Sequence, residues 1–164
     1  MDGTVDDPAQ RAWQDGLQLL ARRELSVQGL RARLADREHS PDAIDAAVTR
    51  LAESGALDDG RVARAYARTA LSVKGRGRLR IARELQVLGI PREIAAEALA
   101  DVFGDVDERA LIDKALDKKL RGRARIAGAA EHARLYQYLM RQGFTPAGVV
   151  AALRRRGGRA DSIE

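Results

Sequence analysis

The chain has 164 residues, of which 45% are hydrophobic and 32% are charged, a composition typical of a folded protein with an apolar core. It contains no cysteine, so disulfides, thiolate zinc sites and cysteine nucleophiles are excluded. The net charge of +5 is uneven: residues 1–57 carry 7 basic and 10 acidic side chains, residues 58–104 carry 9 and 6, and residues 105–164 carry 13 and 8. This gradient indicates a polyanion or an acidic protein as the partner of the later residues, although a basic surface kept for solubility has the same signature.

The sequence contains no obvious membrane or export signal. No apolar run approaches the roughly 18 residues that cross a bilayer. The segment Met1–Pro8 is acidic and polar, unlike a signal peptide. We therefore expect a cytoplasmic protein.

In the first third, the apolar spacing predicts three helices separated by turn residues. The first helix carries Ala12, Leu19 and Leu20. Ser26 is the expected N-cap of the second helix, and Ser40 with Pro41 starts a third that ends at Gly55.

The same order returns in the middle and last thirds. Asp58 and Asp59 open a helix whose expected core stripe is Val62, Tyr66, Thr69 and Val73; a loop at Gly75–Gly77 leads to a helix with Ile81, Leu85 and Leu88; and Pro91 starts another. In the last third, helices around Leu111, around Leu135 and Leu139, and after Pro146 repeat the pattern. No segment alternates with period two for long, so the predicted fold is all-α.

Aligning the second helix of each third reveals a repeat. Leu30, Ile81 and Leu135 superpose, and Glu38, Gly89 and Gly143 follow at the same offset, with periods of 51 and 54 residues. We therefore predict three tandem three-helix repeats in an elongated, curved array: residues 11–57, residues 58–104, which are basic, and residues 105–157. The segments 1–10 and 158–164 are expected to be disordered tails.

No catalytic constellation is found, so no catalytic residue, cofactor or metal ligand is assigned. His39 and His132 lie in different repeats without metal-ligand spacing, and His39 is interpreted as a packing residue. The Gly75–Gly77 loop lacks the remaining features of a phosphate-binding motif. Asp58 and Asp59 are explained by the dipole of the helix that they open.

The strongest polar signal lies in the middle repeat. Residues 61–92 hold nine basic side chains against one acidic one, Glu84. Arginine suits bidentate recognition of phosphate or carboxylate, whereas the bland interpretation is a solvated face. The candidate binding residues are Arg61, Arg64, Arg68, Lys74, Arg76, Arg78, Arg80 and Arg83. A second basic zone comprises Lys118, Lys119, Arg121, Arg123, Arg125 and Arg154–Arg156.

The run Leu57–Arg68, continued by Gly75–Gly77, Ile81, Leu85 and Gly89–Ile90, resembles the central signature of the RecX regulatory proteins. The N-terminal Leu20–Glu24 with Ser26, Leu30 and Leu34 is similar to the first repeat of that family, and Tyr138–Phe144 is similar to the third. Val62 replaces a usual phenylalanine, while Glu38 and His39 replace a glycine and an apolar residue.

This resemblance implies a non-enzymatic modulator of the RecA recombinase. Such a protein lies in the groove of the RecA–single-stranded DNA filament and inhibits ATP hydrolysis, strand exchange and coprotease activity, which restrains recombination and the SOS response. Separately from the resemblance, we expect the chain to be a monomer. The alternative is a protein of tandem helix-turn-helix-like units that binds DNA, including free DNA, without RecA.

Overall fold

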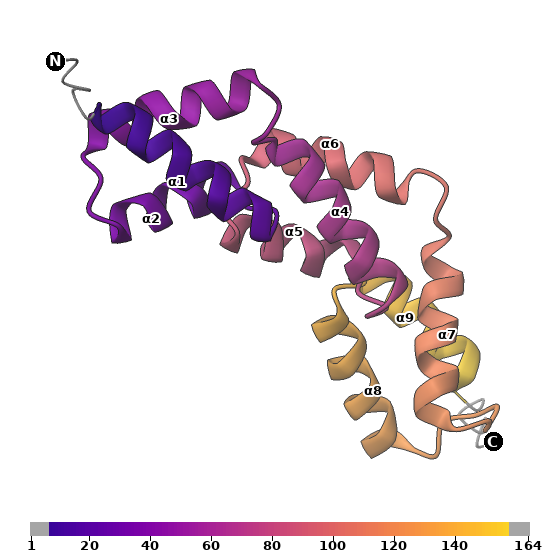
Figure 1. Cartoon of the computed structure of the whole chain (residues 1–164). Helices are drawn as coiled ribbons and strands as arrows, with labels where there is room; N and C mark the ends of the chain where they lie inside the picture. The colour runs from indigo at the N-terminus through magenta and orange to yellow at the C-terminus, as the bar shows by residue number, and fades with distance from the viewer. Residues whose placement is uncertain (1–6, 158–164) are drawn as a thin grey trace, which may run out of the picture. The chain divides into compact units, whose positions relative to one another are not determined.

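The structure is a computed structural model that describes residues 7–157, and within them it contains nine α-helices and no strand (Figure 1). The helices are α1 (Pro8–Arg22), α2 (Val27–Asp36), α3 (Pro41–Glu53), α4 (Asp59–Ser72), α5 (Arg78–Val87), α6 (Arg92–Phe103), α7 (Glu108–Leu120), α8 (Ala129–Gln142) and α9 (Pro146–Arg156). The all-α prediction is confirmed. Helix α1 begins at Pro8, so the predicted tail 1–10 is wrong for its last three residues; residues 1–6 and 158–164 lie outside the described part.

Local capping explains where several helices begin. The hydroxyl of Ser26 accepts the N–H of Gly29 at 3.0 Å, and Ser40 and Thr145 cap α3 and α9 in the same way. Proline lies in the first turn of α1, α3 and α9, where its missing N–H removes no helical hydrogen bond.

The chain divides into two compact units. Unit one comprises residues 1–66 and 85–98, and unit two comprises residues 67–84 and 99–164. Helices α4, α5 and α6 each contribute residues to both units. The repeat boundaries at residues 57 and 104 therefore stay a prediction.

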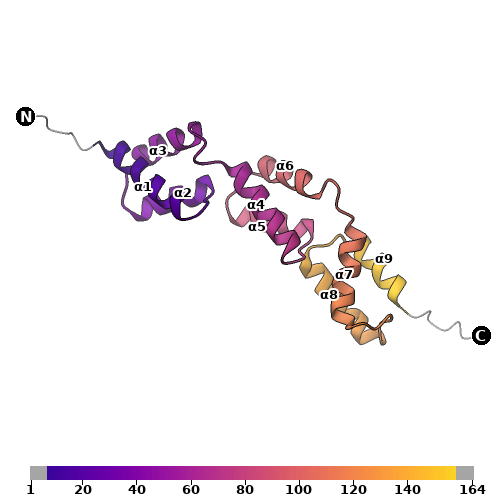
Figure 2. The ribbon, with the colours of Figure 1, turned by 45° about the vertical axis from the view of Figure 1, so that its right-hand side comes forward.

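In unit one, α1 packs against α3 with α2 beside them (Figure 2). The centre of this core is fully buried and includes Ala12, Leu30, Leu34 and Leu51. Each buried leucine stabilises the fold by roughly 2 kcal/mol.

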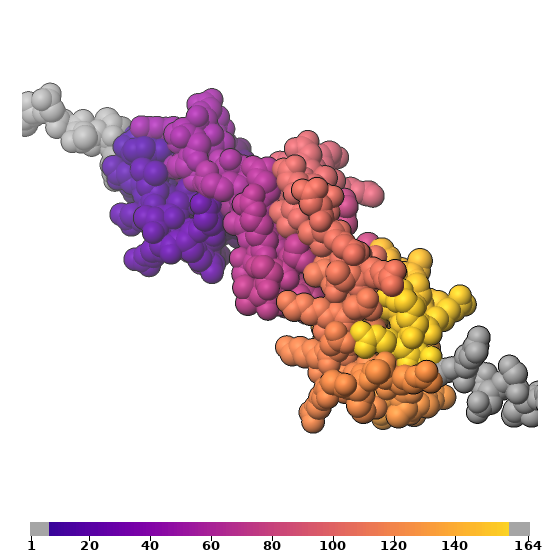
Figure 3. Space-filling model, turned by 90° about the vertical axis from the view of Figure 1, so that its right-hand side faces the viewer, coloured from indigo at the N-terminus to yellow at the C-terminus, as the bar shows by residue number. Residues whose placement is uncertain are grey.

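In unit two, α7 packs against α8 and α9, and the contact of α7 with α9 is visible in the space-filling view (Figure 3). Ile112 and Leu116 of α7 meet Leu139 of α8 and Leu153 of α9 in a core where each is at most 1% exposed. Phe144, in the α8–α9 loop, is the largest fully buried side chain among residues 7–157.

The expected core stripe of the fourth helix is partly wrong. Val73 is 77% exposed because α4 ends at Ser72, and Thr69 is also exposed. The buried hydrophobic positions of α4 are Val62 and three alanines, Ala63, Ala67 and Ala70. Leu88, expected in the core of the next helix, is 40% exposed. Small alanine side chains carry little hydrophobic signal, which explains the error.

Both units contain the same kind of joint, in which the start of one helix meets a later interhelical loop. In unit one, the Ser26 hydroxyl at the start of α2 donates to the carbonyl of Leu88 at 2.6 Å. In unit two, near the start of α5, Gly77 N donates to the carbonyl of Gln142 at 2.7 Å, and Leu79 N donates to that of Gly143 at 3.0 Å.

The glycines of these loops are required by close packing. Gly89 has a φ of +77°, and an added Cβ would lie 2.6 Å from Gln28 Cβ. Gly143 has a φ of +91°, and an added Cβ would lie 2.8 Å from Arg80 Cα. Glu38, the aligned residue of the first repeat, also has a positive φ of 62° but is exposed, so a side chain is tolerated there.

Candidate basic surface and its ion pairs

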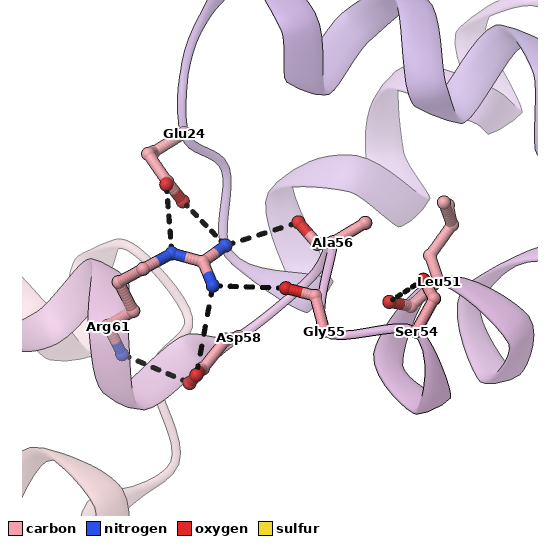
Figure 4. A network of polar contacts seen from close by, with 7 residues as sticks. All are labelled: Glu24, Leu51, Ser54, Gly55, Ala56, Asp58 and Arg61. Atoms are coloured by element: carbon pink, nitrogen blue, oxygen red, sulfur yellow. Dashed lines mark hydrogen bonds and ion pairs between the residues drawn. The ribbon is translucent and has the colours of Figure 1, made fainter.

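Arg61 is the centre of a polar network in unit one (Figure 4). Its guanidinium donates to both carboxylate oxygens of Glu24 at 2.9 and 3.3 Å. It also donates to the carbonyls of Gly55 at 3.0 Å and Ala56 at 3.2 Å. The carboxylate of Asp58 accepts the backbone N–H of Arg61 at 3.0 Å. Arg61 therefore joins the α1–α2 linker, the α3–α4 linker and the start of α4.

The charges in this network are mutually stabilised. The hydrogen bond with Glu24 raises the pKa of Arg61, and the backbone N–H of Arg61 lowers the pKa of Asp58. The Arg61 side chain is 42% exposed and that of Glu24 52%, so screening by water keeps the ion pair itself to about 0–1 kcal/mol. The bonds to two backbone carbonyls make Arg61 mainly a structural residue.

Asp59 lies in the same helix turn as Arg61 but serves another helix. Its carboxylate, only 8% exposed, accepts the N–H of Val27 at 2.8 Å at the start of α2. Burial raises the pKa of Asp59, and the hydrogen bond from Val27 opposes that rise. The helix-dipole interpretation of the Asp58 and Asp59 pair therefore omits the main contact of Asp59.

Two further predicted site residues share one carboxylate in unit two. Arg76 Nη1 lies 2.7 Å and Arg80 Nε 3.0 Å from Glu84 Oε1. Arg80 also donates to the backbone carbonyl of Arg141 at 3.3 Å. The single acidic residue among the nine basic ones is thus placed where it offsets two arginines, and both of these are partly buried.

The remaining predicted residues differ in exposure. Arg64 is half-buried in α4. We call the other four the exposed cation group: Arg68, Lys74, Arg78 and Arg83. All four lie within residues 67–84 of unit two, are exposed, and make no ion pair within residues 7–157. These four charges are available to an anionic partner without the loss of an internal ion pair.

Three of the eight cations of the second basic zone form ion pairs within the described residues. Arg123 forms a two-pronged contact with Glu131, including a 3.1 Å bond from Nη1. Arg155 bonds to Asp113 at 3.2 Å, and Arg156 bonds to Asp117 at 2.7 Å.

Sequence reasoning overlooked the cations of α8. Arg134 and Arg141 are exposed there, on either side of Tyr138 in the sequence. Lys119 of α7 lies over the Tyr138 ring, with its Nζ 4.4 Å from the ring centroid. The spacing of Arg134, Tyr138 and Arg141 at i, i+4 and i+7 could have revealed this shared face.

Membrane-spanning capacity is absent from the described helices: within residues 7–157, none is both long enough and apolar enough to cross a bilayer.

Comparison with known sequences identifies the family. The family model of the RecX second three-helix domain matches residues 58–99, and that of the first three-helix domain matches residues 12–51. The regulatory protein RecX of Halorhodospira halophila is 38% identical over 136 residues, covering 83% of this chain and 82% of the relative. RecX of Chromobacterium violaceum is 37% identical over 149 residues, covering 90% and 91%.

Solved structures agree in fold. The crystal structure of RecX from Lactobacillus salivarius has a TM-score of 0.77 at 19% identity, covering 92% of this chain and 97% of that one. A second crystal structure of a regulatory protein RecX has a TM-score of 0.73 at 18% identity, covering 90% and 72%. The expected helical repeat array is confirmed. The chain belongs to the RecX family of regulatory proteins.

Proposed function

We propose that this chain is a non-enzymatic regulator that binds the RecA–single-stranded DNA filament in the cytoplasm and inhibits RecA ATP hydrolysis, strand exchange and coprotease activity. As a monomer on the filament, it would restrain recombination and the SOS response. Membership of the RecX family is the observation that carries this proposal.

We further propose that the exposed cation group supplies much of the electrostatic contact with RecA or with filament DNA. This proposal is supported by a difference among the eight predicted residues in whether they bind a carboxylate of the chain itself. Arg61, Arg76 and Arg80 already bind carboxylates within the chain. Arg68, Lys74, Arg78 and Arg83 are exposed and have no such partner in the described residues. Surface cations of this kind speed encounter with anionic partners and bind phosphate.

The test is the DNA-dependent ATPase activity of RecA with this protein added. One variant changes the exposed cation group to glutamine: Arg68→Gln, Lys74→Gln, Arg78→Gln and Arg83→Gln. The control removes four exposed cations elsewhere: Arg22→Gln, Arg23→Gln, Arg92→Gln and Lys114→Gln. We expect inhibition by the wild type and by the control, and weaker inhibition by the first variant.

Equal inhibition by both variants would remove the exposed cation group from the proposal. Absence of inhibition by the wild type would remove the proposed function as a whole. A gel shift on duplex and single-stranded DNA, with and without RecA, gives the independent comparison, because a protein acting without RecA would bind equally in both conditions.

A further inference from the structure

A shallow groove runs along α8 beside the end of α7, wholly within unit two. Its polar lining comprises Lys119, Glu131, Arg134, Gln137, Tyr138 and Arg141. None of these residues except Lys119 belongs to the basic zones recognised in the sequence. We call this feature the α8 groove.

The groove carries an excess of positive charge. Lys119, Arg134 and Arg141 are exposed and make no ion pair with the rest of the described chain. The one carboxylate of the lining, Glu131, is bound by Arg123 and by the N–H of Ala127 at 2.6 Å. The charge of Glu131 is offset mainly by Arg123, from outside the groove, and to a smaller extent by Arg134, so the groove keeps a net positive charge.

The geometry of the groove provides both a cationic track and an aromatic surface. Arg134 and Arg141 are seven residues apart on one helix, which corresponds to about 10.5 Å along its axis. Tyr138 lies between them in the sequence and is half-buried, and Lys119 is held over its ring by a cation–π contact. A base stacked on Tyr138 would displace Lys119 from the ring and leave its ammonium to bind a phosphate.

We propose that the α8 groove binds single-stranded nucleic acid, with Lys119, Arg134 and Arg141 on successive phosphates and Tyr138 against an unpaired base. An aromatic ring flanked by cations matches the stacking platforms of single-strand-binding proteins, whereas an acidic protein segment has no group that requires the ring. This inference goes beyond the proposed function because it requires no RecA.

The experiment measures the binding of a fluorescein-labelled oligothymidine to the full chain by anisotropy, from about 50 to about 200 mM salt. The groove variant is Lys119→Gln, Arg134→Gln and Arg141→Gln. The control has the same charge change at exposed positions outside the groove: Lys114→Gln, Arg125→Gln and Arg154→Gln. Circular dichroism establishes that each variant is folded.

Three phosphate contacts predict that the slope of log K against log salt becomes shallower by about 2 in the groove variant and changes little in the control. Tyr138→Leu is expected to weaken binding roughly fivefold or more, and Tyr138→Phe is expected to retain it. Equal slopes for the groove variant and the control would overturn the proposal, as would absence of oligothymidine binding by the wild type. Polyglutamate, tested in the same way, represents an acidic protein segment. A groove variant that loses binding to polyglutamate but keeps binding to oligothymidine would also overturn the proposal.

Discussion

Close packing at the unit-two joint makes a quantitative prediction about three glycines. At Gly143 an added Cβ meets two obstacles: a φ of +91° that disfavours L-residues, and contact with the first turn of α5. At Gly77 no positive φ is involved, but a Cβ would lie 2.5 Å from the carbonyl carbon of Gly143. At Gly75 the φ of +60° is the only obstacle, since nothing lies within 4 Å. The three substitutions by alanine therefore separate backbone strain from steric overlap.

The expected losses of unfolding free energy follow from these geometries. Gly75→Ala incurs about 1–2 kcal/mol of left-handed strain, reduced by the lower entropy of the unfolded alanine chain, for a net loss of about 1 kcal/mol. Gly77→Ala forces the joint to shift at a cost of about 1–3 kcal/mol. Gly143→Ala combines both effects and should lose about 2–5 kcal/mol.

Urea unfolding followed by far-UV circular dichroism measures all three variants against the wild type. The predicted order of destabilisation is Gly143→Ala, then Gly77→Ala, then Gly75→Ala. If Gly143→Ala and Gly75→Ala were equally destabilised, the joint would not be closely packed in solution and the reasoning would be refuted. As a comparison in unit one, Glu38→Ala should change stability little, because Glu38 already accommodates a Cβ at positive φ.

Helix positions were largely accessible to sequence reasoning because they depend on local signals. The expected cap at Ser26, the helix start at Ser40 and Pro41, and the proline at position 146 marked helix starts correctly. The glycines at positions 89 and 143 were recognised as a repeating feature, but their reason was not. That reason is contact with a helix far away in the sequence, which no local pattern reveals.

The candidate site was harder to predict than the fold because ion pairs depend on tertiary placement. Arg61 was named as a candidate binding residue, yet Glu24 binds it from a linker 37 residues earlier in the chain. Glu84 was visible in the sequence, but the spacing of Arg76 and Glu84 gave no sign of their 2.7 Å contact. A count of charges over a segment cannot register partners contributed by other segments.

Three further predictions concern polar contacts. Arg61→Ala should lower the free energy of unfolding by about 1–2 kcal/mol, because it removes hydrogen bonds to two backbone carbonyls. A urea midpoint equal to that of the wild type would contradict the structural role of Arg61. The two-pronged contact with Arg123 and the Ala127 N–H lower the pKa of Glu131 from 4.5 to about 2, so the stabilising contribution of Glu131 is present above pH 4.5 and is lost as the pH falls towards 2. NMR titration of the Glu131 carboxyl carbon should show this pKa, and Arg123→Gln should raise the pKa. Asp59→Asn keeps an acceptor for the Val27 N–H and removes a buried charge, whereas Asp59→Ala loses the cap at a cost of about 1 kcal/mol. Thermal unfolding should therefore show Asp59→Asn to be the more stable variant, and equal stability of the two would refute the capping role.

Binding to the RecA filament is the measurement that decides whether this RecX-family chain acts there as proposed. Fluorescence anisotropy of the labelled chain can be measured with RecA-coated single-stranded DNA, with the same DNA alone, and with RecA alone. We expect tighter binding to the coated strand than to either component. Equal affinity for the coated and the bare strand would contradict the proposal.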